Sequence, residues 1–200
     1  MVVQTNPAAI ELESFLNPYV GKIQEAIQSG FDRYFLIPEE FRMEMATSKP
    51  TVIRDFIISK VKQAFEGDPT VTLQSSRKLF TITIGNRVNI CFKKMDLRRR
   101  VSSILTGQSL KYRLQQKLEL FPGQINLYAG YISDAGFQAI ESVYLVRTQG
   151  FRNIWELSLL EGPDAASIIQ MFPDSDLPVT GPKITLNPPA EKEGDAQQQA

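Results

Sequence analysis

Histidine is absent from this chain, and cysteine occurs once, as Cys91. The missing histidine excludes Ser-His-Asp and Cys-His catalysis and any zinc site with imidazole ligands. A lone cysteine excludes a disulfide framework within the chain, a Cys-ligated zinc site and a Cys-ligated iron–sulfur cluster. Cys91 falls in an expected strand, where a small buried side chain is a more ordinary role than a nucleophile. We therefore predict a non-enzymatic protein with no catalytic residue, no metal site and no cofactor.

Long apolar runs and a targeting signal are also lacking. The longest apolar runs are only a few residues, too short to cross a bilayer. The N-terminus, MVVQTNPAAI, has no basic region before an apolar run, so a secretory signal is not expected. These absences predict a cytoplasmic protein with no membrane partner.

The composition is that of a folded domain. The 200 residues are 42% hydrophobic and 10% aromatic, which is enough for a substantial core. The 22 basic and 22 acidic residues give a net charge of zero. A protein that coats nucleic acid over its whole surface is excluded, so only a local concentration of charge can matter.

Three segments have the three- and four-residue apolar spacing of a helix. The first is 8–29, which Asn17-Pro18 is expected to interrupt and Ser29-Gly30 to end. The second is 50–66, which carries one apolar stripe and ends at Gly67-Asp68-Pro69. The third is 109–120, with leucines four residues apart and Ser109 as its N-terminal cap.

A β-hairpin is the clearest strand pattern. Residues 79–84 and 88–95 both alternate between apolar and polar side chains, and Gly85-Asn86 marks the turn. A three-residue turn pairs Ile84 with Val88, Ile82 with Ile90 and Phe80 with Phe92, whereas a two-residue turn mixes the faces. Because the apolar faces match only with the three-residue turn, we favour that register. Lys94 then falls on the apolar face, where it must reach the edge or an anionic partner.

Short turns separate the later strands, expected at 124–133, 138–147 and 152–160, and predict an antiparallel meander. With a short strand at 70–74, the chain is predicted to be α+β: a mainly antiparallel sheet of about five to six strands, two N-terminal helices and one inserted helix. We expect residues 1–160 to form a single domain. Residues 161–200 hold six of the twelve prolines and predict a flexible, disordered tail. Its segment 165–172 (AASIIQMF) is either a short docked helix or a linear motif for a partner.

The strongest local charge lies between residues 93 and 117, with eight basic residues and, before Glu119, one acid, Asp96. Such a segment could hold phosphates, a nucleic-acid backbone or an acidic protein surface, or be a solvated face without a specific role. Tyr112, between two basic residues, could stack on a base. The predicted binding residues are Lys93, Lys94, Arg98, Arg99, Arg100, Lys111, Tyr112, Arg113 and Lys117.

A metal-dependent nuclease is one further alternative. Its candidate carboxylates are Asp55, Asp96, Asp134, Glu141 and Glu156. Such a site needs clustered acids with a lysine on a strand, and neither Glu141 nor Glu156 has a lysine two residues later. The chain also lacks a helix-turn-helix, a zinc finger, an aromatic RNA-binding signature and a glycine-rich phosphate loop.

Several stretches together carry a family resemblance: PTVIRDFIISKVKQAF, NICFKKMD, Gln115-Gln116 before FPGQINLYAGYISD, and a closing IWEL. Over about residues 50–160 the chain resembles uncharacterised bacterial proteins of prophages and mobile elements. Those are commonly encoded beside proteins that combine a helix-turn-helix with a zinc-peptidase-like domain, in gene pairs that look like toxin–antitoxin or phage-defence modules. The resemblance implies Phe92, Lys93, Lys94, Gly130 and Tyr131 as pattern positions, without a known role.

The first hypothesis is therefore a protein-binding antitoxin or regulator whose partner is a toxin encoded by a neighbouring gene. The second is a nucleic-acid-binding protein that uses residues 93–117, and the third is the nuclease. Whether the chain forms a homo-oligomer is left open.

Overall fold

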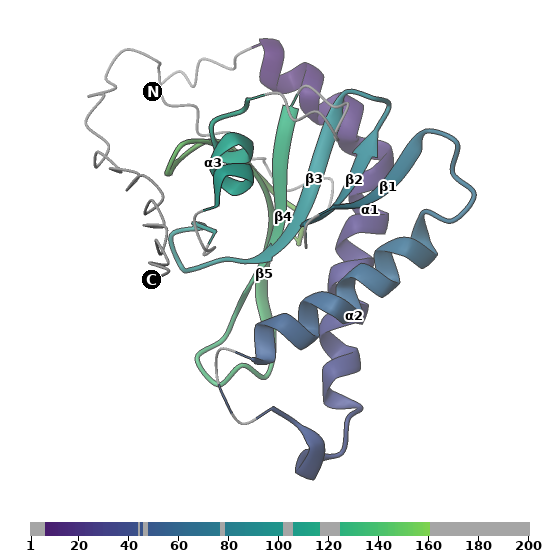
Figure 1. Cartoon of the computed structure of the whole chain (residues 1–200), viewed down its shortest axis with the longest axis vertical. Helices are drawn as coiled ribbons and strands as arrows, with labels where there is room; N and C mark the ends of the chain where they lie inside the picture. Colours follow the sequence, from purple (N-terminus) through teal and green to yellow (C-terminus); the bar gives the residue numbers. More distant parts are fainter. Residues whose placement is uncertain are drawn as a thin grey trace, which may run out of the picture.

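The computed structural model describes residues 7–43, 45, 48–76, 79–101, 106–116 and 125–160 (Figure 1). Its elements run in the order α1 (Pro7–Phe35), η1 (Glu39–Phe41), α2 (Lys49–Ala64), β1 (Val71–Ser76), β2 (Leu79–Ile84), β3 (Val88–Lys94), α3 (Gly107–Arg113), β4 (Ile125–Ser133), β5 (Ile140–Gln149) and β6 (Arg152–Ser158). This order confirms the predicted α+β class with two N-terminal helices and one inserted helix. The expected tail at 161–200, including 165–172, lies outside the described residues.

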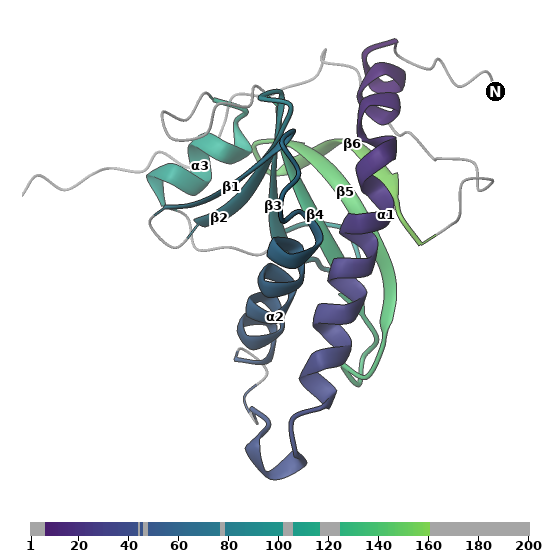
Figure 2. The same ribbon diagram turned by 90° about the vertical axis from the view of Figure 1, so that its right-hand side faces the viewer.

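The strands of the described residues form a six-stranded sheet in sequence order, from β1 to β6. Neighbouring strands are antiparallel except β3 and β4, which are parallel. A parallel pair needs a crossover connection, and α3 lies within it. The crossover places α3 on one face of the sheet, while α1 and α2 cover the other face (Figures 1 and 2).

Alternation along the strands builds two cores. Ile90 and Phe92 of β3 pack in the larger core beneath α1 and α2. Cys91 of β3 and Tyr128 of β4 point to the other face and pack with Tyr112 of α3. Neighbouring residues of one strand therefore serve different layers, as the two-residue period of a strand requires.

The hairpin register predicted from the sequence is confirmed. Ile82 pairs with Ile90, and Ile84 pairs with Val88. The rings of Phe80 and Phe92 lie on the same face with their centroids 6.2 Å apart. The meander of β4, β5 and β6 is confirmed as well.

The predicted break and end of the first helix are wrong, because α1 continues from Pro7 to Phe35 with Pro18 inside it. Pro18 and Ser14 are both exposed, so the carbonyl group that loses its hydrogen-bond donor at this proline can turn to water. Gly30 does not end the helix but allows close contact with α2. A Cβ atom at Gly30 would lie only 2.5 Å from the Cα atom of Ile57.

The inserted helix also differs from its prediction. It spans Gly107–Arg113, where 109–120 was expected, and residues 117–124 lie outside the description. Thr106 is its N-cap, and Ser109 instead completes a capping box with it. Its buried side chains are Tyr112 and Arg113, not those of the expected leucine stripe.

Candidate functional site

Tyr112 and Arg113 anchor α3 to the sheet. The Tyr112 hydroxyl lies 2.9 Å from the carbonyl oxygen of Asn89 and 2.7 Å from that of Leu127. Burial raises the pKa of this hydroxyl well above its usual value. Arg113 donates from a terminal nitrogen to the Val101 carbonyl oxygen at 2.5 Å. Because Tyr112 is 1% exposed, the expectation that it stacks on a base is wrong, and the buried Arg113 is likewise part of the fold.

A buried network of amide side chains, which the sequence did not predict, also attaches α3 to the sheet. The Asn89 side chain donates to the Asn126 side-chain oxygen at 2.8 Å, and Thr83 donates to Asn89 at 2.9 Å. Gln115, at a φ of 57°, bonds to both the backbone N–H and the carbonyl of Asn126. Each contact gives a buried polar group its partner, which fixes α3 over β3 and β4.

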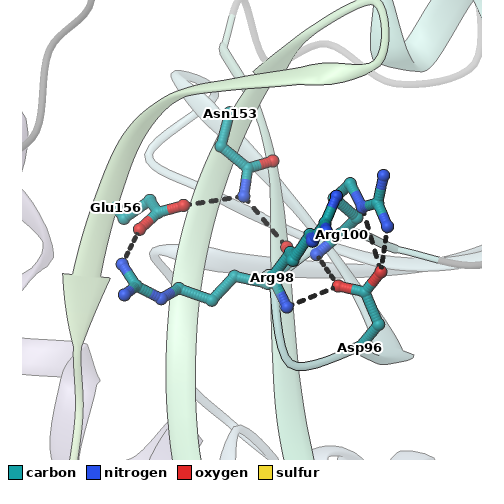
Figure 3. A network of polar contacts seen from close by, with 6 residues as sticks. Asp96, Arg98, Arg100, Asn153 and Glu156 are labelled. Atoms are coloured by element: carbon teal, nitrogen blue, oxygen red, sulfur yellow. Dashed lines mark hydrogen bonds and ion pairs between the residues drawn. The ribbon is translucent and has the colours of Figure 1, made fainter.

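The loop that leaves β3, residues 95–101, is closed at its base by a bridge between Met95 and Val101. Asp96 organises it, because one carboxylate oxygen accepts from the backbone N–H groups of Arg98 and Arg100 at 2.9 and 2.8 Å (Figure 3). The other oxygen accepts from the Arg100 Nε at 3.0 Å. Burial acts to raise the pKa of Asp96, but the hydrogen bonds from Arg100 and Arg98 outweigh it and hold that pKa below its usual value.

A second contact ties the tip of this loop to β6. Arg99, in a left-handed backbone conformation with φ of 59°, forms an ion pair with Glu156. The Asn153 amide donates to the Glu156 carboxylate at 2.7 Å and to the Arg99 carbonyl oxygen at 2.9 Å (Figure 3). The Arg99 guanidinium also lies 5.0 Å from the ring centre of Tyr144. The loop is therefore held at both its base and its tip.

Beside the loop lies a hollow of about 550 Å³, which we call the arginine groove. Its lining residues are Leu97, Arg98, Arg99, Arg100, Phe151, Arg152, Asn153 and Glu156. Two of its side chains are large, apolar and exposed: Leu97 is 79% exposed and Phe151 57%. The groove thus combines apolar side chains with four arginines and one glutamate.

The first residues of the loop also line a larger cavity of about 940 Å³, which we call the lysine pocket. Its lining residues come from the N-terminal half of α2, the ends of β3 and β4, and the turn that leads to β5. Its lining residues are Pro50, Thr51, Arg54, Lys93, Lys94, Met95, Asp96, Leu97, Ile132, Ser133, Asp134, Ala135, Phe137 and Glu141. Leu97 belongs to both hollows.

Lys93 and Lys94 are the half-buried cations of this pocket. Burial lowers the pKa of both ammonium groups, and the nearby charge of Arg54 lowers that of Lys93 further. The Lys94 Nζ atom lies 4.0 Å from the ring centre of Phe137. The sequence predicted that Lys94 reaches the edge or an anion; an aromatic ring is its partner here.

Gly130 leaves space for the residues at the start of this loop. A Cβ atom there would lie 2.6 Å from the Lys93 carbonyl oxygen and 2.6 Å from the Met95 Cε atom. Only glycine therefore lets Met95 lie over β4 at this point. The family resemblance gave Gly130 as a pattern position without a role, and this close packing is a physical reason for glycine there.

The predicted binding residues do not form one basic surface. Lys93 and Lys94 line the lysine pocket, whereas Arg98, Arg99 and Arg100 line the arginine groove. Lys111 is exposed on α3, Tyr112 and Arg113 are buried, and Lys117 lies outside the described residues. Sequence reasoning missed Arg54, Leu97, Phe151 and Arg152; an apolar side chain beside a run of arginines was the available signal for Leu97.

Three of the acids considered for a nuclease are held by partners elsewhere in the fold. Asp96 bonds to Arg100, Glu156 pairs with Arg99, and Asp134 accepts from the backbone N–H groups of Gln138 and Ala139. Within the described residues, no group of three or more histidine, cysteine, aspartate or glutamate side chains is placed to hold a metal ion.

Fold and site together define an α+β protein in which the residues of one basic loop, 95–101, line two hollows. No protein-family model, curated protein or solved structure matches the chain. Among the helices described, none has the length and apolar character needed to span a membrane.

Proposed function

We propose that the protein binds another protein in the cytoplasm and acts as an antitoxin or regulator rather than as an enzyme. The observation that carries the proposal is the arginine groove, where Leu97 and Phe151 are exposed among arginines. Aromatic side chains and arginine are enriched in protein interfaces, and exposed apolar side chains gain free energy when a partner covers them. The partner chemistry that fits is an acidic segment carrying an apolar anchor.

The fixed shape of the loop supports the same proposal. Asp96 and the Arg99–Glu156 pair hold residues 95–101 before any partner arrives. A loop that is already ordered loses less conformational entropy on binding, so more of the contact energy contributes to affinity. Leu97 and Arg98 are the side chains that this loop presents to a partner.

The test is binding to the protein encoded by the neighbouring gene, measured by co-purification and then by calorimetry. The Leu97→Ser/Phe151→Ser variant should weaken binding by about tenfold or more, because both changes remove exposed apolar contact area from the groove. Arg98→Glu should weaken it through charge reversal. Leu36→Ser is the matched control, since Leu36 is 82% exposed but lies at the far end of α1.

Three results would overturn the proposal. One is a monodisperse monomer that ignores the neighbouring protein and does not relieve its toxicity. Another is equal weakening by Leu36→Ser. The third is tight binding to DNA or RNA that falls steeply with salt and is lost in Arg98→Ala/Arg99→Ala/Arg100→Ala, which would favour a nucleic-acid role.

A further inference from the structure

The two outer strands of the sheet differ in how their edges are protected. β1 and β6 are these outer strands, at opposite ends of the strand order (Figure 2). β6 carries Arg152 and Glu156, and its pairing with β5 is interrupted by a register shift. β1 (VTLQSS) has no charged residue and no proline, and it pairs with β2 without a shift over all six residues. Charges, prolines and bulges are the usual means of blocking an open edge, so β1 is left able to accept another strand.

The hydrogen bonds at the start of β1 show which of its backbone groups point outward. The Gly85 N–H donates to the Thr70 carbonyl oxygen at 2.8 Å, whereas the Val71 N–H donates to a carbonyl of the preceding turn at 3.2 Å. Because backbone groups alternate in direction along an antiparallel strand, those of Leu73 and Ser75 also point away from β2. Within the described residues, β1 has β2 as its one neighbouring strand.

The side chains of β1 also suit the addition of a strand at this edge. Leu73 pairs with Ile82 of the larger core and therefore lies on the face that α1 and α2 cover, yet it is 36% exposed. Thr72 and Ser75 are exposed as well. A partly exposed leucine at the rim of a core gains free energy when a neighbouring strand covers it.

The charges beside β1 identify an occupant that fits. A hollow of about 650 Å³ is lined by β1 and by the end of α2, with Lys62 and Glu66 among its residues. The Lys62 Nζ atom lies 5.7 Å from the ring centre of Phe80, which pairs with Ser75 near the end of β1. Glu66 is exposed in the turn that leads to the start of β1. A two-fold axis through the middle of β1 therefore brings Lys62 of one copy towards Glu66 of the other.

We propose that β1 pairs with β1 of a second copy of this chain, antiparallel and centred on Leu73, so that the two sheets join edge to edge. Leu73 then exchanges both backbone hydrogen bonds with the second copy's Leu73, and the Ser75 N–H donates to the second copy's Val71 carbonyl oxygen. The two leucine side chains pack on each other across the axis, and the paired strands place no like charges opposite each other.

This dimer does not depend on the proposed protein partner. The arginine groove is lined by residues of β6, at the other edge of the sheet. Each copy therefore keeps its own groove open, and loss of the dimer leaves binding of the protein partner to be judged separately.

The test is sedimentation equilibrium of the full chain over about 1–500 μM, combined with amide hydrogen exchange. The chain should dimerise reversibly, and exchange at Leu73 and Ser75 should slow as the concentration rises, because the dimer supplies the partners of these outward N–H groups. Leu73→Lys should weaken the dimer by about tenfold or more, since it removes the leucine contact and places two like charges opposite each other. Leu160→Lys is the matched control, because Leu160 is 37% exposed but follows β6 at the other edge.

Two kinds of further variant keep the test decisive. Ser75→Pro removes an N–H that β2 does not use, so it should weaken the dimer even where Leu73→Lys fails to fold. Leu73→Cys should form a disulfide between copies under mild oxidation and Ser75→Cys should not, because only residue 73 lies opposite its own counterpart. Cys91 is buried and does not compete.

Three results would overturn the proposal. One is a chain that stays monomeric up to about 500 μM. Another is equal weakening of the dimer by Leu160→Lys. The third is protection of the Leu73 and Ser75 amides that does not depend on concentration, which would mean that another part of the same chain covers β1.

Discussion

The Arg99–Glu156 ion pair should respond very differently to the loss of one partner or the other. Their side chains differ in exposure, 36% for Arg99 and 11% for Glu156. Without Glu156, the Arg99 guanidinium can turn to water and keep its place over Tyr144. Without Arg99, the Glu156 carboxylate stays largely buried, with the Asn153 amide at 2.7 Å as a neutral donor. Arg99→Ala should therefore cost more stability than Glu156→Gln.

The magnitudes follow from this asymmetry. Breaking a fully buried pair costs about 3–5 kcal/mol, and the partial exposure of Arg99 reduces this to about 2–3 kcal/mol for Arg99→Ala. Glu156→Gln keeps the shape and the acceptor for Asn153, so its cost should be about 1 kcal/mol. For a domain of this size, 1 kcal/mol corresponds to about 2–4 °C in Tm.

Urea unfolding followed by circular dichroism is the assay. The decisive variant is Arg99→Ala/Glu156→Gln, which should be more stable than Arg99→Ala alone because the stranded carboxylate is gone. Arg98→Ala, at an exposed position of the same loop, is the matched control and should change stability by less than about 0.5 kcal/mol.

Equal costs for the two single variants, or a double variant less stable than Arg99→Ala, would refute this reasoning. Either result would mean that Arg99 acts through its backbone conformation, φ of 59°, rather than through its charge.

Three other predictions concern the frame around the site. Gly30→Ala should destabilise the protein by about 1–3 kcal/mol in urea unfolding, because the added Cβ meets the Ile57 backbone at 2.5 Å; Gly21→Ala, with open space, is its control. Tyr112→Phe should cost about 1–2 kcal/mol, since it leaves two buried carbonyl groups without their shared donor, and an unchanged midpoint would contradict the anchoring role. Cys91 is buried and its pKa is raised to about 11 by burial, so iodoacetamide at neutral pH should modify it only in denaturant, as read by mass spectrometry.

The hairpin and the meander could be predicted because their signals are local. Alternating side chains and a glycine-containing turn determine which residues pair, and a shift of one residue would put the apolar face in water. The end of α1 could not be predicted in this way. Gly30 is an ordinary stop signal by itself, and only the approach of Ile57, far along the chain, makes it a contact residue within a helix.

The parallel pairing of β3 and β4 likewise depends on what lies between them. Residues 95–124 are long enough for a crossover, but the sequence does not say on which face the connection returns. The hydrogen bonds that hold the connection on its face of the sheet join Tyr112 to Asn89 and Leu127, and Asn89 to Asn126. These polar side chains look like surface residues in a linear reading because their partners lie on other elements.

The basic residues between positions 93 and 117 show the same limit of prediction from sequence. Adjacent basic residues look equivalent in the sequence, yet Arg99 meets a carboxylate 57 positions away and Arg113 turns into the core. Arg99 and Arg100, which the sequence predicts to contact a partner, also hold the loop through Glu156 and Asp96. Arg99 and Arg100 thus order the loop that carries Leu97, and Leu97 lines both the arginine groove and the lysine pocket. A variant that loosens this loop should therefore weaken binding of the proposed protein partner, as a change at Phe151 should.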